Sequence, residues 1–154
     1  MSVNVRSPGP RYLALLQVLR TADTLWHCSQ RFFARWELSP SQFNVLNLLR
    51  EEHAGLSQIE LGRLLITHRS NVTGLVDRLV DRGLVHRHEA VDDRRAYRVV
   101  LTATGRRLLE KVLPEYYQVA EAVWAGFPPA RARRLAAELE ELQVNAEQIT
   151  GGGT

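Results

Sequence analysis

Side chains suited to nucleic acid recognition gather in the middle of the chain. Within about three helical turns, the sequence places hydroxyl, imidazole, amide and guanidinium groups at Thr67, His68, Arg69, Ser70, Asn71, Thr73 and Arg78. Arginine can bond guanine through two hydrogen bonds, asparagine can bond adenine in the same way, and hydroxyl groups bond bases or phosphates. These residue types predict a surface that reads base edges. The alternative is an ordinary amphipathic helix with a polar outer face.

A second polar cluster follows at a turn. Asp93, Arg94 and Arg95 lie between two β-branched or apolar runs, residues 84–88 and 97–101, a pattern typical of a β-hairpin. An arginine at the tip of a hairpin can enter a narrow minor groove, where negative potential is concentrated. Asp93 can pair with that arginine and hold it extended. The alternative is a solvated hairpin tip.

The elements around these clusters have clear helix signals. Ser57 can cap a short helix, with Glu60 completing a capping box, and Ser57 and Gln58 are further candidates for DNA contact. In the helix predicted over 69–82, the residues expected to face inward are Val72, Leu75, Val76, Leu79 and Val80. Two such helices joined by a tight turn form a helix-turn-helix, whose second helix reads the major groove. Arg78 and Arg82 then serve phosphates.

Long amphipathic helices are predicted on both sides of this region. They cover residues 10–36, a stretch from Thr102 in which Pro114 should cause a kink, and residues 130–149. Because the segment 40–100 can cover only part of their apolar stripes, we expect a second copy of the chain to bury the rest. A self-packed monomer is the alternative. The expected organisation is a dimerisation helix (1–36), a winged helix-turn-helix (37–102), dimerisation helices (103–150) and a loose tail (151–154).

Composition limits the class of protein. The 154 residues are 45% hydrophobic, which is enough for a folded core, and no run reaches the roughly 18 apolar residues of a membrane span. The N-terminus lacks the apolar segment of a signal peptide, and a single cysteine, Cys28, fits a reducing cytoplasm. Residues 63–107 carry ten basic and five acidic side chains, so the positive charge concentrates there. We therefore expect a cytoplasmic protein.

Enzymatic and redox interpretations have weaker support. His86 and His88 share one face of a strand beside Glu89, which is at most half a metal site. No phosphate-binding glycine loop, zinc-type spacing or nucleophile elbow is present, so no enzyme, metal or cofactor is predicted. Cys28 beside His27 would fit a redox sensor, but a buried thiol acting as a small hydrophobic residue is the preferred interpretation.

In order and spacing, these motifs resemble those of the MarR family of winged-helix transcription regulators. The resemblance covers about residues 10–148 and rests on five segments: 56–61 (LSQIEL), 71–79 (NVTGLVDRL), 82–85 (RGLV), 93–96 (DRRA) and 101–105 (LTATG). It implies a mainly α fold with a β-hairpin wing and a homodimer on a pseudo-palindromic operator. It also implies that Arg95 enters the minor groove, with Arg94 closer to the backbone, and that a small ligand releases a repressor.

The effector and the mode of DNA binding stay open at this point. In resembling proteins, phenolic or carboxylate ligands bind between the dimer helices and the winged helix. The matching region of this chain offers Trp26, His27, Gln30, Trp36 and Phe43, and Tyr116 and Tyr117 are further candidates. Aromatic walls with a few polar groups suit an aromatic carboxylate or a phenol, although aromatic residues at helical spacing also form plain core. The alternative function is nonspecific or architectural binding to double-stranded DNA with the same fold.

Overall fold

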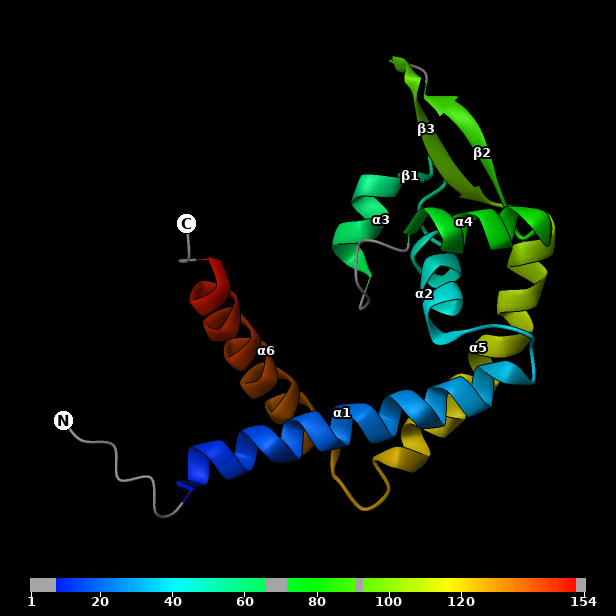
Figure 1. Cartoon of the computed structure of the whole chain (residues 1–154). Helices are drawn as coiled ribbons and strands as arrows, with labels where there is room; N and C mark the ends of the chain where they lie inside the picture. Colours follow the sequence, from blue (N-terminus) through cyan, green and yellow to red (C-terminus); the bar gives the residue numbers. More distant parts are fainter. Residues whose placement is uncertain (1–7, 66–71, 91–92, 152–154) are drawn as a thin grey trace. The chain divides into compact units, whose positions relative to one another are not determined.

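The computed structural model describes residues 8–65, 72–90 and 93–151, and for residues 90, 93–96, 150 and 151 it describes the backbone alone. Six helices and three strands follow one another in this part of the chain (Figure 1): α1 (Pro10–Ala34), α2 (Pro40–Leu48), β1 (Leu56–Ser57), α3 (Gln58–Leu64), α4 (Val72–Asp81), β2 (Val85–Ala90), β3 (Asp93–Leu101), α5 (Ala103–Val123) and α6 (Pro129–Gly151). The chain divides into two units, Met1–Leu113 and Pro114–Thr154.

Capping boxes begin two of the short helices, as the sequence predicts. At α2, the Ser39 hydroxyl accepts from the Gln42 N–H at 3.1 Å and the Gln42 side chain accepts from the Ser39 N–H at 2.8 Å. At α3, Ser57 and Glu60 exchange the same two bonds at 3.2 and 2.7 Å. These bonds satisfy N–H groups that the first turn of a helix otherwise leaves without partners.

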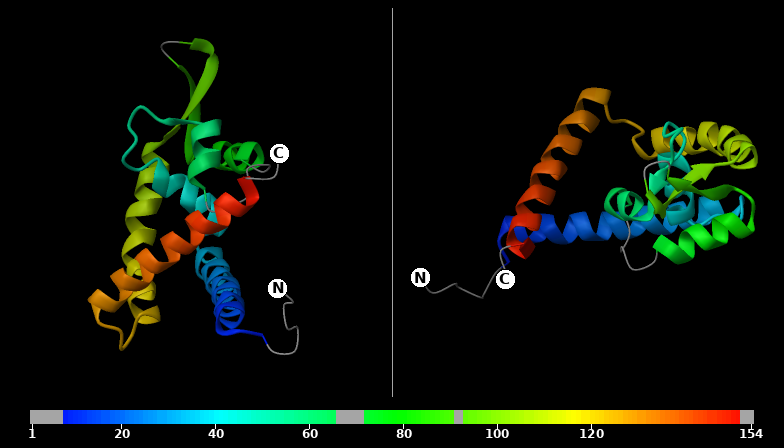
Figure 2. Two further views of the ribbon diagram at one scale, coloured as in Figure 1. Left: turned by 90° about the vertical axis from the view of Figure 1, so that its left-hand side faces the viewer. Right: turned by 90° about the horizontal axis from the view of Figure 1, so that it is seen from above.

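The wing is a three-stranded antiparallel sheet of order β1-β3-β2. The sequence predicts β2 and β3 but misses β1, because two residues that start a helix have no strand pattern of their own. The hairpin is also longer than predicted, since β3 begins at Asp93 and only residues 91–92 separate the two strands. Cross-strand backbone pairing here outweighs the polar side chains. Figure 2 shows the hairpin extending away from α2, α3 and α4.

The core of the first unit forms between its helices and the inner face of the sheet. The ring of Phe33 in α1 stacks on that of Phe43 in α2 with centroids 4.3 Å apart. The inward face predicted for α4 is confirmed for Val72, Leu75, Val76 and Leu79, which are all buried. The core therefore holds α4 in a single orientation, with its polar face turned outward.

Helices α1 and α6 have ends that differ by a few residues from the sequence predictions, whereas α5 includes Pro114 in its interior, as predicted. Helix α1 ends at Ala34, and the turn that follows places Glu37 at a φ of 53°. Helix α5 continues through Pro114 to Val123 as one α-helical element. Helix α6 begins at Pro129, where proline is tolerated in the first turn, and it includes Gly151, which the sequence predicts to be loose.

Large apolar side chains of the outer helices are exposed in the single chain. In α1 they are Tyr12, Leu13, Leu15, Leu19 and Leu25, and in α6 they are Leu135, Leu139, Leu142, Val144 and Ile149. The sequence predicts this surplus of apolar surface. In the part of the chain that the structure describes, no helix is both long and apolar enough to span a membrane.

Candidate nucleic-acid interface

Helices α3 and α4 meet at a polar contact on the surface. The Thr73 hydroxyl donates to the Gln58 side-chain oxygen at 3.0 Å, so two predicted DNA-contact residues are brought together. Beside them lies a hollow of about 320 Å³, lined by Gln58, Ile59, Gly62, Arg63, Val72 and Thr73. The predicted readers Thr67, His68, Arg69, Ser70 and Asn71 lie outside the described residues.

Ser57 combines a structural bond with an available donor. Its hydroxyl oxygen accepts the Glu60 N–H as part of the capping box, which leaves the hydroxyl proton for another acceptor. Ser57 can therefore donate to a phosphate without giving up its role at the start of α3.

The arginines of α4 and the segment after it have different surroundings. Arg78 is exposed, as a phosphate contact requires. Arg82 instead donates to the backbone carbonyls of Trp36 and Glu37, with its guanidinium 4.0 Å from the Glu37 carboxylate. The prediction that Arg82 serves phosphates is thus replaced by a structural role, since its donors bind the turn after α1. This contact joins positions 45 residues apart, and no local pattern indicates it.

An ion pair joins α4 to the wing. The Arg87 guanidinium in β2 donates to the Asp77 carboxylate in α4 at 2.6 Å, and the two side chains are 27% and 52% exposed. Sequence analysis missed this pair, because a helix end and a turn separate its members. The pair connects the wing to α4.

The backbone of Asp93, Arg94 and Arg95 belongs to β3, while their side chains lie outside the described part of the structure. The minor-groove role of Arg95 therefore stays a prediction. His86 and His88 have ring centroids 6.3 Å apart on β2. Among the described residues, no group of three or more histidine, cysteine, aspartate or glutamate side chains could hold a metal ion.

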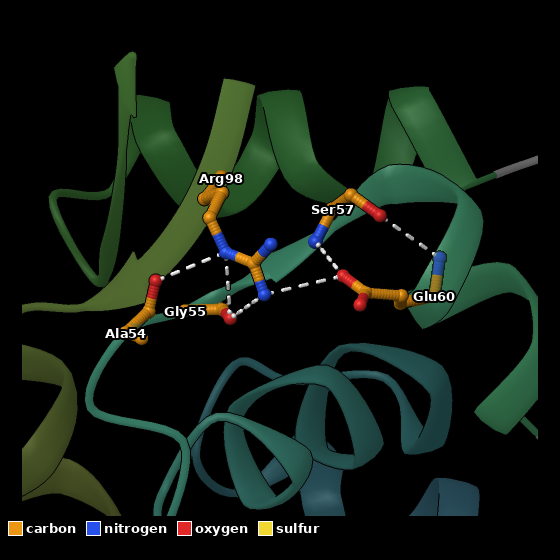
Figure 3. A network of polar contacts seen from close by, with 5 residues as sticks. All are labelled: Ala54, Gly55, Ser57, Glu60 and Arg98. Atoms are coloured by element: carbon orange, nitrogen blue, oxygen red, sulfur yellow. Dashed lines mark hydrogen bonds and ion pairs between the residues drawn. The ribbon is translucent and has the colours of Figure 1, made fainter. Parts of the chain in front are cut away.

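Arg98 and Glu60 form a polar network at the base of the wing (Figure 3). The Arg98 guanidinium donates to the carbonyls of Ala54 and Gly55 and lies 3.4 Å from the Glu60 carboxylate. Hydrogen bonds from Ser57, the backbone bond first, together with the charges of Arg98 and Arg63, hold the pKa of Glu60 below its ordinary value of 4.5. Glu60 is therefore an anion at neutral pH and a lasting partner for Arg98.

The predicted effector residues have unequal environments. Phe43 is buried against Phe33 in the core, whereas His27 is exposed in α1 and its Nδ1 lies 2.8 Å from the Asp23 carbonyl oxygen. Trp26 is half-buried and Gln30 is exposed on the same helix. Cys28 is exposed in the single chain, which corrects the prediction of a buried thiol.

Two buried polar atoms, one in the turn after α1 and one in α2, have no hydrogen-bond partner among the described residues. They are the indole nitrogen of Trp36 and the side-chain oxygen of Asn47. A donor and an acceptor left in this state are costly unless water or a ligand satisfies them.

Comparison with known proteins identifies the family. The profile of the MarR family matches residues 36–96. The HTH-type transcriptional repressor YetL of Bacillus subtilis (strain 168) is 32% identical over 118 residues, which cover 75% of this chain and 68% of YetL. The chain belongs to the MarR family. The expectations of a winged helix-turn-helix fold, a DNA-binding transcription regulator and no enzyme are thereby confirmed.

Solved structures of other DNA-binding proteins have the same fold. The Bordetella bronchiseptica regulator BpsR, whose DNA binding is regulated by 6-hydroxynicotinic acid, has a TM-score of 0.76 at 24% identity, over 92% of this chain and 98% of BpsR. The organohalide-sensing regulator RdhR-CbdbA1625, bound to 2,4-dichlorophenol, has a TM-score of 0.79 at 17% identity, over 97% and 92%. The agreement extends through the N- and C-terminal helices of this MarR-family chain.

Proposed function

We propose that this protein is a ligand-responsive repressor that binds a pseudo-palindromic operator as a homodimer. The observation that carries the proposal is the linkage of three DNA-facing elements. The Gln58–Thr73 hydrogen bond joins α3 to α4, and the Asp77–Arg87 ion pair joins α4 to the wing. Elements held in this way can present side chains to the major groove and to the adjacent minor groove of one DNA duplex.

The exposed apolar residues of the outer helices support the homodimer. In α6, Leu135, Leu139 and Leu142 follow the i, i+4, i+7 spacing of one helical face, and each is between 37% and 41% exposed. In α1, Tyr12, Leu15 and Leu19 follow the i, i+3, i+7 spacing, which also defines one helical face. Apolar surface on this scale marks a protein interface, and a second copy carries the matching surface by symmetry.

Replacing Arg95 with alanine should weaken operator binding by about tenfold, because one minor-groove contact is lost from each half-site. The loss should be larger when the flanking base pairs are A·T than when they are G·C. Binding is measured by fluorescence anisotropy, with a duplex that the unaltered protein selects from a random library and with a random duplex of equal length.

The same measurement separates the repressor from the nonspecific alternative. A sequence-specific regulator keeps the selected duplex at a salt concentration that releases random DNA, because nonspecific binding is almost wholly electrostatic. Equal affinity for both duplexes at every salt concentration would contradict the proposal and favour an architectural protein.

An aromatic carboxylate or a phenol is the effector class that we propose. The aromatic ligands named for BpsR and RdhR-CbdbA1625 support it by analogy. In this chain, the Trp36 indole N–H is a buried donor without a partner among the described residues, and it suits a carboxylate or phenolate oxygen. Trp26, His27 and Gln30 in α1 remain proposed contacts on the side of the dimer helices.

Effector binding should weaken the complex with the selected duplex and raise the melting temperature of the free protein. The test uses benzoate, salicylate, 6-hydroxynicotinic acid and 2,4-dichlorophenol. Changing Trp36 to phenylalanine keeps an aromatic ring but removes the N–H, so it should reduce the affinity of an active compound by about tenfold. A panel with no effect on DNA binding or melting would rule out this effector class, and an unchanged response in Trp36→Phe would rule out the indole contact.

A further inference from the structure

Arg98 lies in β3 at the point where the three-stranded part of the sheet becomes the two-stranded β2–β3 hairpin. Strand β1 pairs with β3 only through Leu56 with Val99 and Ser57 with Arg98, and β2 continues alongside β3 to Ala90. In the described backbone, residues 93–97 of β3 therefore pair with β2 alone. A two-stranded ribbon is marginally stable by itself, so its orientation depends on how its base is held.

The Arg98 guanidinium holds that base to the segment before α3. Its Nε donates to the carbonyl oxygens of Ala54 and Gly55, both at 3.1 Å, and its Nη2 donates to Gly55 at 2.8 Å. The planar fork of arginine makes several bonds in one plane, which lysine cannot do. One side chain of the central strand thus binds two consecutive carbonyl groups of the preceding turn (Figure 3).

The turn itself leaves little freedom for these carbonyl groups. Gly55 has a φ of +76°, and a Cβ at this position would lie 2.5 Å from the backbone oxygen of Val99 and from the Val100 side chain. Glycine therefore permits the close approach of the turn to β3. Arg98 therefore binds carbonyl groups of a turn that packs closely against β3.

Glu60 extends the network into α3. Its carboxylate oxygen accepts the Ser57 N–H at 2.7 Å and lies 3.4 Å from the Arg98 Nη2. Gln58 in the same turn accepts from Thr73 of α4, the predicted recognition helix. One connected set of contacts therefore includes the base of the wing, the start of α3 and α4. Arg98 is 32% exposed, and with Glu60 as a partner its charge is largely neutralised within the protein.

We infer that Arg98 is a positioning residue for the wing, which sets the affinity for DNA by fixing the hairpin against α3 and does not itself bind phosphate. The inference rests on the proposed function. It predicts that loss of the guanidinium weakens DNA binding through the wing tip, and that the number of phosphate contacts does not change.

The test measures Kd for the selected duplex over a range of salt concentrations with the full-length protein. The variants are Arg98→Gln, Arg98→Lys, Arg95→Ala and the double variant Arg95→Ala/Arg98→Gln. Arg98→Gln and Arg98→Lys should each raise Kd about tenfold, with the slope of log Kd against log salt unchanged. In the Arg95→Ala background, Arg98→Gln should raise Kd less than about twofold, because the effects of residues that act together are not additive.

Arg134→Gln is the matched control, since it also removes one arginine and one ion pair, that with Glu138 in α6. It should change Kd by less than about twofold. If Arg98→Gln does not fold, Arg98→Lys and its double variant with Arg95→Ala decide the question by themselves.

Four results would overturn the inference. A slope reduced by about 1.8, which is about 0.9 for each of the two subunits, identifies Arg98 as a phosphate ligand. Full binding by Arg98→Lys shows that charge alone is sufficient. A lower melting temperature of Arg98→Gln with unchanged Kd shows a structural role separate from the wing. The same conclusion follows if the losses of affinity caused by Arg98→Gln and Arg95→Ala add fully in the double variant. If the unaltered protein selects no duplex, the proposed function fails instead.

Discussion

Affinity for the operator should fall by about two to four orders of magnitude when glutamate replaces Leu19 and Leu139 together. Two linked binding modules gain about 10²- to 10⁴-fold over one module, and a monomer retains a single recognition helix and a single wing. Leu19 is 58% exposed and Leu139 is 39% exposed in the single chain, so the substitutions affect the intersubunit surface more than the fold of each copy. Sedimentation velocity gives the oligomeric state, and anisotropy with the selected duplex gives the affinity.

A control variant places the same charge on the opposite face of α6. Ala137 is exposed, and its position two residues from both Leu135 and Leu139 turns it away from the stripe of Leu135, Leu139 and Leu142. Ala137→Glu should leave both the oligomeric state and the affinity unchanged. If the double glutamate variant sediments as a monomer but binds the operator with undiminished affinity, the dimeric mode of binding is wrong.

Substitution of Gly105 by alanine should reduce the stability of the protein by about 3 kcal/mol, as expected for an overpacked site. A Cβ at Gly105 would lie 2.2 Å from the backbone oxygen of Leu84 and 2.8 Å from the Leu101 side chain. The Leu84 oxygen has little room to move, because it accepts from the backbone N–H of Thr102 at 3.1 Å and from its hydroxyl at 3.0 Å. Helix α5 must therefore shift away from the start of β2.

Thermal unfolding at fixed protein concentration measures this effect, and the melting temperature should fall by about 10 °C. Gly9 provides the control, because it has an ordinary φ of −68° and a Cβ there would meet nothing within 4 Å. Gly9→Ala should have the same melting temperature as the unaltered protein. Equal melting of Gly105→Ala and Gly9→Ala would show that α5 can move at no cost.

Local signals made much of this chain predictable. The capping boxes at Ser39 and Ser57 each involve residues three positions apart, so the sequence alone displays both partners. The inward face of α4 follows from the 3.6-residue period of its apolar residues. The same principle accounts for the exposed apolar residues of α1 and α6, whose spacing along the chain is sufficient to indicate an interface.

Contacts between distant segments could not be predicted in this way. Strand β1 consists of two residues, and it exists because β3 lies beside it. The structure directs Arg82 to the turn after α1, Arg87 to Asp77 and Arg98 to the turn before α3, and none of these partners is a close neighbour in the sequence. No pattern of neighbours distinguishes an arginine that binds protein from one that is available for phosphate.

The cluster of polar side chains that we predict to read bases, and the hairpin that follows it, could be recognised from the sequence alone, because residue type and periodicity are local properties. Which arginines bind other parts of the protein and which remain exposed was decided only by the tertiary structure, since the answer depends on carbonyl and carboxylate groups brought close from positions up to 46 residues away. A hydrogen bond requires its partners within about 3 Å, and only the folded chain specifies that separation.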